Sequence, residues 1–351
     1  ILPEAIKKTI KVKEILKLGE VKTINEAVEK MDLSRSAYYK YKDYVFPFFE
    51  IAQGKIVSIY VSMSNESGML SSVLKAIAEE KLHLENVDRR DIHVNVLGIN
   101  HFTWFDYAAY KGVDLFPVYR EYIEEHYEEG YNEPDKNWAN SAFNCAHRVK
   151  FDLFKRYGFI AAAGDRHLAE FMPGDEYLND PETVKSWKFG LTTVDWRKED
   201  LKKRLERSHR LAAGEEEIDL TPTGEEGILL IKALCGLGRV VSNVNIPNTA
   251  GQIPNLPENA LVETNALFDR DSIHPVAAGK VPENVKALLM PHIENHERTL
   301  KAALTCDEEL VVQAFLHDPV VKGKQPQEAQ VRSLVHDMIE NTRKYLPDGW
   351  N

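Results

Sequence analysis

Two stretches of this chain carry ionisable and amide side chains inside runs that are otherwise apolar. They are Ala161–Phe171, with the sequence AAAGDRHLAEF, and Gly98–Trp104, with the sequence GINHFTW. Burial of a polar group costs free energy unless the group is hydrogen-bonded or used by the protein. Titratable groups in such surroundings often mark a functional site, so these stretches are the first candidates for one.

The length and composition indicate a globular chain of two or three domains. The 351 residues are 43% hydrophobic, and no apolar run approaches the roughly 20 residues that cross a membrane. The first residues lack the order of a signal peptide, and a start at Ile1 rather than Met suggests an incomplete N-terminus. Cys145, Cys235 and Cys306 are too few and too widely spaced for a disulfide framework, so we expect a reducing cytoplasm.

Charge is divided unevenly along the chain. Residues 1–81 carry 13 Lys and Arg against 11 Asp and Glu, whereas the remainder carries 31 against 44. The large acidic part repels phosphate backbones, so we expect it to bind nucleic acid poorly. The contrast also suggests that the two parts have separate origins.

Residues 1–54 are predicted to be helical. Thr23 and Glu26 have the spacing of a capping box, and Ser34 can cap a second short helix. Two short helices joined by a tight turn have the outline of a helix-turn-helix. In that interpretation the residues facing a DNA groove are Ser34, Arg35, Ser36, Tyr39 and Lys40. The alternative is a small helical bundle with Tyr38 or Tyr41 in its core, and the small net charge favours it.

Residues 55–81 have the pattern of one strand, one turn and one helix. Lys55–Met63 is rich in β-branched residues and predicts the strand, and Leu70, Val73 and Ile77 mark one face of the helix. This unit resembles the opening of an ACT domain, and residues 1–81 are similar to small bacterial proteins with a helix-turn-helix-like segment before such a domain. That family binds an amino acid at the loop corresponding to Asn65–Gly68. One strand and one helix cannot close a core, so we expect this truncated unit to borrow a partner or to lack order.

The chain changes character near Lys81–Glu85. Asp91–His101 is an apolar run that ends in polar residues, which predicts a strand delivering Asn100 and His101 at its C-terminal end. From here to about Leu346 the chain resembles the C-terminal half of glycoside hydrolase family 4, in the branch acting on α-galactosides and uronic-acid sugars. The resemblance rests on five stretches in the family's order, which are Val96–Trp104, Ala146–Phe154, Ala161–Phe171, Val244–Asn248 and Asn255–Glu263.

The resemblance implies an unusual glycosidase reaction. NAD oxidises the C3 hydroxyl of the sugar, which acidifies the C2 proton, and a Mn²⁺-type ion holds the C2 and C3 oxygens as a Lewis acid. A base then removes the C2 proton, the glycosidic oxygen leaves and the steps reverse with water, so family 4 is an exception to the two-carboxylate mechanism. The family's metal-binding histidine corresponds to His101, with Asn100 beside the sugar. Its catalytic base corresponds to Asp165, a role that suits an aspartate whose pKa is raised by burial.

Each of these residues also has a structural interpretation. His101 can be a core residue rather than a metal ligand, and Asp165 can cap the helix that starts at His167. Arg166 and His167 can contact the substrate, or can pair only with Glu170 one turn along.

Two further groups of polar residues lie in this segment. Cys145 and His147 stand two residues apart, but the sequence shows no second close pair, so we expect no metal site there. Asn243, Asn245 and Asn248 lie close together and predict a polar loop at the end of a strand.

The parts of family 4 that bind NAD are missing from the sequence. Such enzymes begin with a Rossmann domain, yet no G-x-G-x-x-G occurs in the 351 residues, and Gly236–Gly238 is too short to qualify. The family's second metal ligand, a cysteine, and its acid also come from that half. One histidine alone does not hold a divalent ion against water. We therefore expect glycosidase descent with impaired activity, and NAD or Mn²⁺ binding that depends on the missing half.

We predict an α+β (mixed α/β) fold in three segments: residues 1–54, 55–81 and 82–351. The helices expected in the last segment span 143–157, 198–211, 281–306 and 328–345, and the strands 239–245 and 260–268. Family members associate through such helices, so we expect a homo-oligomer that acts on a small carbohydrate and has no membrane partner. The alternatives are an amino-acid-responsive regulator, and a fusion of two unrelated proteins without integrated function.

Overall fold

The structure is a computed structural model, and it describes residues 4–17, 21–42, 69–82, 92–132, 137–219, 226–270 and 272–350. The chain divides into two compact units, Ile1–Val61 and Ser62–Asn351. The predicted strand at 55–63, the loop at 65–68 and most of the change of character at 81–85 lie outside the described residues.

The described residues of the first unit form three helices, α1 (Glu4–Lys17), α2 (Ile24–Lys30) and α3 (Arg35–Tyr41). Both predicted caps are confirmed. Thr23 accepts a hydrogen bond from the Glu26 backbone N–H at 3.3 Å, and Ser34 accepts one from Ala37 at 3.2 Å. Tyr38 is buried between the helices and Tyr39 is exposed. The helical prediction is therefore correct for residues 4–17 and 21–42, while DNA binding stays a prediction.

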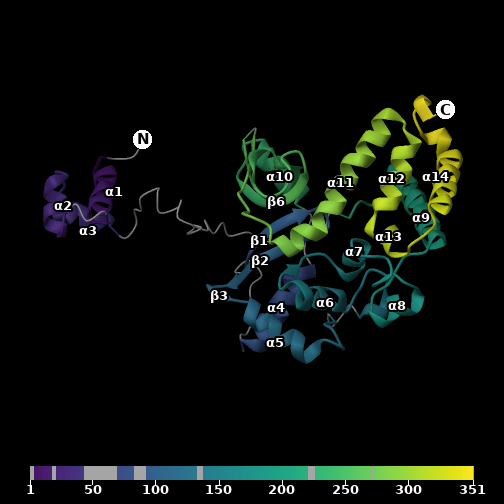
Figure 1. Ribbon diagram of the computed structural model, residues 1–351, viewed down its shortest axis with the longest axis horizontal. Helices are drawn as coiled ribbons and strands as arrows, with labels where there is room; N and C mark the ends of the chain where they lie inside the picture. Colours follow the sequence, from purple (N-terminus) through teal and green to yellow (C-terminus); the bar gives the residue numbers. More distant parts are fainter. Residues whose placement is uncertain are drawn as a thin grey trace. The chain divides into compact units, whose positions relative to one another are not determined.

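The described elements of the second unit are groups of antiparallel strands separated by runs of helices (Figure 1). Its strands are β1 (Ile92–Ile99), β2 (Phe102–Tyr110), β3 (Val113–Asp114), β4 (Ile160–Ala161), β5 (Val240–Pro247), β6 (Leu261–Asp269) and β7 (Ser272–Pro275). Its first helices are α4 (Met69–Lys81), α5 (Phe116–His126), α6 (Arg148–Tyr157), α7 (Asp165–Glu170), α8 (Pro181–Ser186) and α9 (Val194–Ala213). The others are α10 (Gly227–Leu234), α11 (Glu283–Thr305), α12 (Glu308–His317), α13 (Pro319–Gly323) and α14 (Glu328–Thr342).

In the described residues, the first sheet has four antiparallel strands, and its central β1–β2 hairpin is packed on both faces. β1 pairs with β2 from Ile92 opposite Tyr110 to Ile99 opposite Phe102, and β4 pairs with the other side of β2. Leu97 and Ile99 lie in a core shared with α6, α7 and α11, whereas Ile92 and Val96 lie in a second core. The predicted strand is confirmed, but it belongs to a hairpin rather than to a parallel sheet.

Helix α4 packs in the core of the second unit. Leu74, Ile77 and Ala78 are at most 1% exposed and share a hydrophobic cluster with β1, β2, α5 and α6. Lys81, at the end of α4, forms ion pairs with Glu121 and Glu125 of α5. The segment that resembles an ACT domain thus supplies a helix to the core of the glycosidase-like part, and no borrowed strand is needed to bury that helix.

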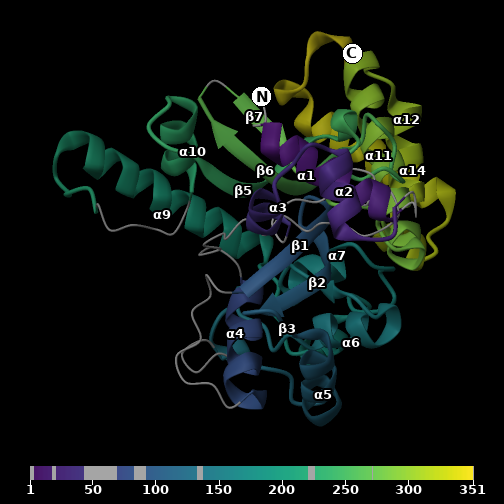
Figure 2. The same cartoon turned by 90° about the vertical axis from the view of Figure 1, so that its left-hand side faces the viewer.

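The second sheet, in the order β5–β6–β7, is antiparallel throughout. Ala266 and Phe268 of β6 are buried against Ala233 of α10. The long helix α9 extends away from the sheets in Figure 2, and none of its 20 residues is buried. The observed elements confirm the predicted α+β fold. None of the described helices is long and apolar enough to span a lipid bilayer.

Candidate functional site

The tip of the β1–β2 hairpin carries Asn100 and His101. These two residues form the turn between the strands, and His101 adopts φ 60°, the left-handed conformation that such tight turns need. Its side chain is exposed rather than part of the core. The prediction that a strand delivers both residues at its end is confirmed.

Strands β5 and β6 bring further polar groups to this tip. Asn245 donates to Asn100 Oδ1 at 3.3 Å, and Asn243 donates to Glu263 Oε1 at 2.5 Å. Burial raises the pKa of Glu263, while bonds from Asn243 and from the His101 backbone N–H oppose that shift. The second sheet therefore orients the hairpin tip through amides and one half-buried carboxyl group.

Helix α7 brings Arg166 and His167 to the same place. The rings of His101 and His167 lie 4.6 Å apart between centroids, and His167 Nδ1 lies 3.3 Å from Glu170 Oε2. Burial lowers the pKa of His167, the Glu170 carboxylate opposes this, and the neighbouring His101 adds to it. His167 therefore pairs with Glu170, as its structural interpretation predicts, and also contacts the hairpin tip.

Asp165 is fully buried at the first position of α7. Its side chain does not cap α7, whose N-cap is Gly164. Oδ1 instead accepts a hydrogen bond from the Lys150 backbone N–H at 3.1 Å, at the N-terminus of α6. Oδ2 is buried and has no hydrogen-bond partner among the described residues. Asp165 therefore caps a different helix from the one expected and keeps one oxygen uncommitted.

The surroundings of Asp165 shift the pKa of its carboxyl group. Burial raises the pKa of its carboxyl group to about 6, against the opposing effects of the Lys150 ammonium and of the backbone N–H groups at the start of α6. Lys150 is itself 0% exposed, and its ammonium lies 3.3 Å from the Ala162 carbonyl oxygen. Asp165 thus has the raised pKa that a general base near neutral pH requires.

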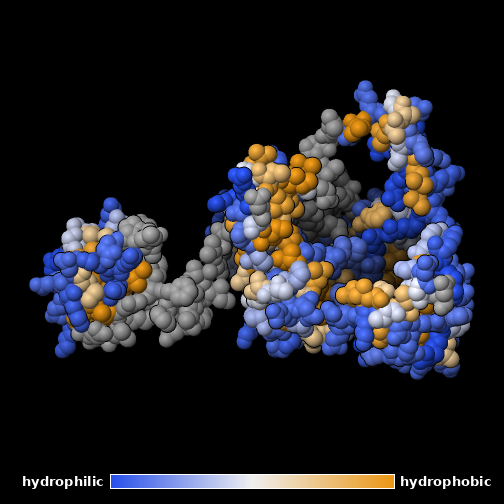
Figure 3. Space-filling model, turned by 90° about the horizontal axis from the view of Figure 1, so that it is seen from above, coloured by the Kyte–Doolittle hydropathy of each residue, from blue (hydrophilic) through white to orange (hydrophobic). Residues whose placement is uncertain are grey.

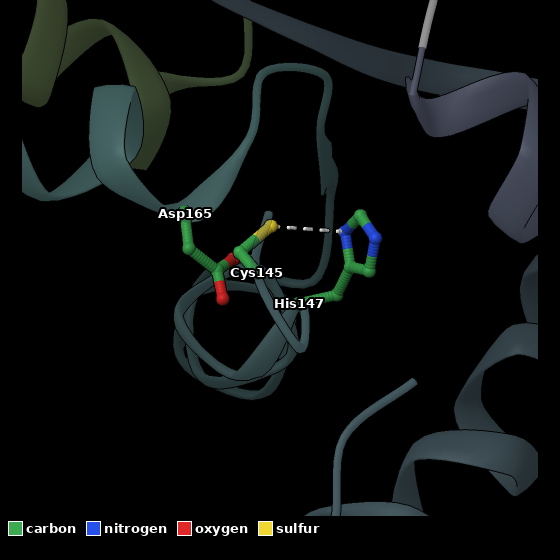
Figure 4. A group of neighbouring side chains, drawn as sticks. All are labelled: Cys145, His147 and Asp165. Atoms are coloured by element: carbon green, nitrogen blue, oxygen red, sulfur yellow. Dashed lines mark hydrogen bonds between the residues drawn. The ribbon is translucent and has the colours of Figure 1, made fainter. Parts of the chain in front are cut away.

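Cys145 and His147 adjoin the same carboxyl group (Figure 4). Their ligating atoms and a carboxylate oxygen of Asp165 lie within 4.8 Å of one another, and all three side chains are buried. The Cys145 Sγ and His147 Nδ1 atoms are 3.9 Å apart. The sequence shows no second close pair for Cys145 and His147, but the fold brings Asp165 to them, so three potential ligands lie together.

A narrow hollow of about 40 Å³ opens beside these groups, lined by Ala142–Cys145 and Gly164–His167. Arg166 stacks over the Phe143 ring at 5.1 Å and lies 3.5 Å from His167. Its Nη1 atom is buried without a hydrogen-bond partner among the described residues. Arg166 therefore offers an unused donor at a hollow that Asp165 also lines.

The metal and the cofactor implied by the resemblance do not fit this chain alone. Among the described residues His101 belongs to no group of three potential metal ligands, and the group that does occur, Cys145, His147 and Asp165, excludes it. The sequence carries no glycine-rich turn for NAD. The roles assigned to Asn100, His101, Asp165, Arg166 and His167 stay predictions.

Sequence reasoning missed one residue of this site, Glu263. It lies in a stretch that supports the family resemblance, at a strand position next to buried Val262 and Thr264. An acidic residue at an inner position of an alternating strand indicates a half-buried carboxyl group. Such a group usually has a hydrogen-bond or charge partner, so the pattern could have identified Glu263.

The raised pKa of Asp165 predicts how the stability of the second unit depends on pH. Its pKa is raised from 3.8 to about 6, so ionisation opposes folding. The stability that the neutral form provides is complete below pH 3.8 and is lost as the pH rises through 6, by about 3 kcal/mol in all. Cys145 and Tyr119, which face this carboxyl group, have raised pKa values and stay protonated, and His147 stays neutral. A ¹³C NMR titration should place the Asp165 midpoint near pH 6, and a midpoint at or below 4 would contradict the assignment.

Comparison with known proteins places most of this unit in one family. Residues 96–321 match the model described as "Family 4 glycosyl hydrolase C-terminal domain". An alpha-galacturonidase from Lachnoclostridium phytofermentans is 65% identical over 279 residues, covering 80% of this chain and 60% of that protein. The chain thus spans about three fifths of the length of the curated relatives it matches.

Two solved structures share the fold. The Bacillus subtilis glucosidase lplD is similar with a TM-score of 0.71 and 37% identity, over 95% of this chain and 74% of the other. A 6-phospho-alpha-glucosidase from gut microorganisms, solved with NAD and Mn²⁺, is similar with a TM-score of 0.56 and 16% identity, over 79% of this chain and 60% of the other. The second likeness concerns the fold only.

The N-terminal part of the chain matches a different kind of protein. An ACT domain-containing protein of the UPF0735 group, from Desulforamulus reducens, is 57% identical over 81 residues. The match covers 23% of this chain and 55% of that protein. Both resemblances noted in the sequence are therefore confirmed.

Proposed function

Because the chain belongs to glycoside hydrolase family 4, we propose that its second unit is the sugar-binding and proton-abstracting part of an α-galacturonidase. One observation carries the proposal. Asp165, at the position of the family's base, is fully buried, has a pKa of about 6 and keeps one carboxylate oxygen without a partner. A base of this kind is partly ionised near neutral pH and is not committed to a structural bond at that oxygen.

The proposed sugar site is built from three elements. Asn100 and His101 at the hairpin tip contact the ring hydroxyls, and His167 closes the site from α7. Asp165 removes the C2 proton of the bound sugar. Glu263 and Asn243 hold the hairpin tip in position through the contacts described above.

The proposed specificity for a uronic acid rests on Arg166. A galacturonic-acid sugar differs from galactose by a carboxylate, and a guanidinium is the side chain best suited to bind it. Arg166 Nη1 is buried without an acceptor among the described residues and borders the same hollow as Asp165. The sugar carboxylate would supply the missing acceptor.

Replacing Arg166 by Gln should weaken binding of galacturonic acid roughly 10- to 100-fold, because charge-assisted hydrogen bonds contribute about 1.5–3 kcal/mol. Galactose binding should change little. Isothermal titration calorimetry of the full chain with both sugars measures the ratio. Arg204→Gln on the exposed helix α9 is the matched control. Equal loss for both sugars, or no loss for either, would remove Arg166 from carboxylate recognition.

We further propose that turnover depends on NAD and a divalent ion, as the family resemblance implies, and that the chain alone turns over poorly. The described residues complete neither site. An assay of an aryl α-galacturonide with NAD and Mn²⁺ tests this: the chain should bind the uronic acid yet release little of the aryl group. Rapid release would disprove the impairment, and failure to bind uronic acid would disprove the site.

We also propose that the protein is cytoplasmic and forms a homo-oligomer. Helix α9 has no buried residue, and α10 exposes Ile228 and Ile231. Hydrophobic side chains gather over the α10 region in Figure 3. A long helix without a buried face gains little stability from packing in the monomer. We therefore propose that a second copy of the chain packs against these exposed residues.

A further inference from the structure

Three side chains of different chemistry converge beneath the proposed sugar site. Cys145 and His147 lie in the segment that enters α6, and Asp165 is the first residue of α7. Figure 4 shows Cys145 between the other two, with its sulfur directed at the imidazole. The 3.9 Å between Sγ and Nδ1, and the 4.8 Å limit for the whole group, suit three ligands around one tetrahedral ion with bonds of about 2.0–2.3 Å.

Two further observations point to a ligand at this place. The Asp165 Oδ2 atom is fully buried and has no hydrogen-bond partner among the described residues. His147 is 2% exposed and adopts φ 58°, a strained conformation for a residue other than glycine. Strain of this kind persists where the surrounding structure holds a side chain in a required position. The hollow beside Cys145 and Asp165 has room for a water molecule as a fourth ligand.

We propose that Cys145, His147 and Asp165 form a binding site for a zinc-like divalent ion, separate from His101. Thiolate, imidazole and carboxylate are three donors that zinc binds in proteins. On binding, the Cys145 thiol releases its proton to solvent as the sulfur–metal bond forms. His147 binds as the neutral imidazole, and Asp165 binds through its uncommitted oxygen.

The charges around the site set the strength of binding. The Lys150 ammonium repels a bound metal cation. The Cys145 thiolate and the Asp165 carboxylate must therefore offset the positive charges of both the ammonium and the metal ion. Lys150→Met should therefore tighten metal binding.

An occupied site has a consequence for the reaction, and this step rests on the proposed function. A metal bound to Asp165 removes the carboxylate that would abstract the sugar proton. Zinc bound at this site would therefore act as an inhibitor.

Cobalt titration of the metal-free full chain tests the site without sugar or turnover. We expect one Co²⁺ per chain and a thiolate-to-cobalt charge-transfer absorption, reversed by Zn²⁺. The absorption should disappear in Cys145→Ala and in His147→Gln. It should persist in Cys235→Ser, which alters an exposed free cysteine, and in His101→Gln. Circular dichroism verifies the fold of each variant.

The outcomes separate this inference from the proposed function. Absence of the thiolate signal in a folded chain, or its survival in Cys145→Ala, overturns the metal site and leaves the sugar site untouched. Loss of the signal in His101→Gln with retention in His147→Gln also overturns it, because the ion then lies at the hairpin tip. Loss of uronic-acid binding with an intact cobalt signal overturns only the sugar site.

Discussion

Asp165→Asn is expected to destabilise the second unit by about 1–3 kcal/mol, although it keeps the acceptor for the α6 backbone. The reason is that the amide places a buried donor where Oδ2 has no hydrogen-bond partner among the described residues. The buried Lys150 ammonium also loses its attraction to this carboxylate, and removal of the buried negative charge opposes that loss.

A double-mutant cycle isolates this interaction. Lys150→Met alone should cost less than Asp165→Asn, because a carboxyl group with a pKa near 6 can take up a proton and become neutral. The double variant should lose less stability than the sum of the two single variants. Urea unfolding of the four proteins at pH 7 gives the coupling free energy. Additive losses would show that Lys150 and Asp165 act independently.

Leu74→Ala in helix α4 is expected to destabilise the second unit by about 2–5 kcal/mol. Leu74 is 1% exposed and packs in the cluster formed with β1, β2 and α5. Removal of the isobutyl group leaves a cavity in this core, and the loss grows with the cavity that remains. The prediction matters because α4 lies in the segment with the ACT-like pattern.

Tryptophan fluorescence makes the measurement specific to one unit. All five tryptophans lie in residues 62–351, so their unfolding transition reports that unit alone. Glu80→Ala, on the exposed face of the same helix, should leave the transition within about 0.5 kcal/mol of the original. An unchanged transition in Leu74→Ala would show that α4 is no part of this core.

The sequence predicted the elements whose patterns are local. Ser34 and Thr23 cap their helices as expected, because a cap is decided within four residues. The long helix α11 lies within two residues of its predicted bounds. Strand β2 was missed, because both its faces are buried and its residues lack the alternation that marks a half-buried strand.

The candidate site was predictable only in part, because only some of its residues follow from local sequence patterns. The hairpin tip with Asn100 and His101 follows from an apolar run that ends in polar residues. The bond from Asp165 to α6 joins residues 15 apart in the chain and depends on how α6 and α7 pack. The same helix packing brings Cys145 and His147 close to Asp165, so the spacing of these residues in the sequence does not indicate the cluster.

The central claim is that His101 and Asp165 serve one bound sugar, and NMR titration of the full chain with galacturonic acid tests it most directly. The His101 imidazole and the Asp165 carboxyl resonances should both shift and should saturate at the same sugar concentration. A response of His101 without any response of the Asp165 carboxyl would contradict the claim, since one ring would then not reach both groups.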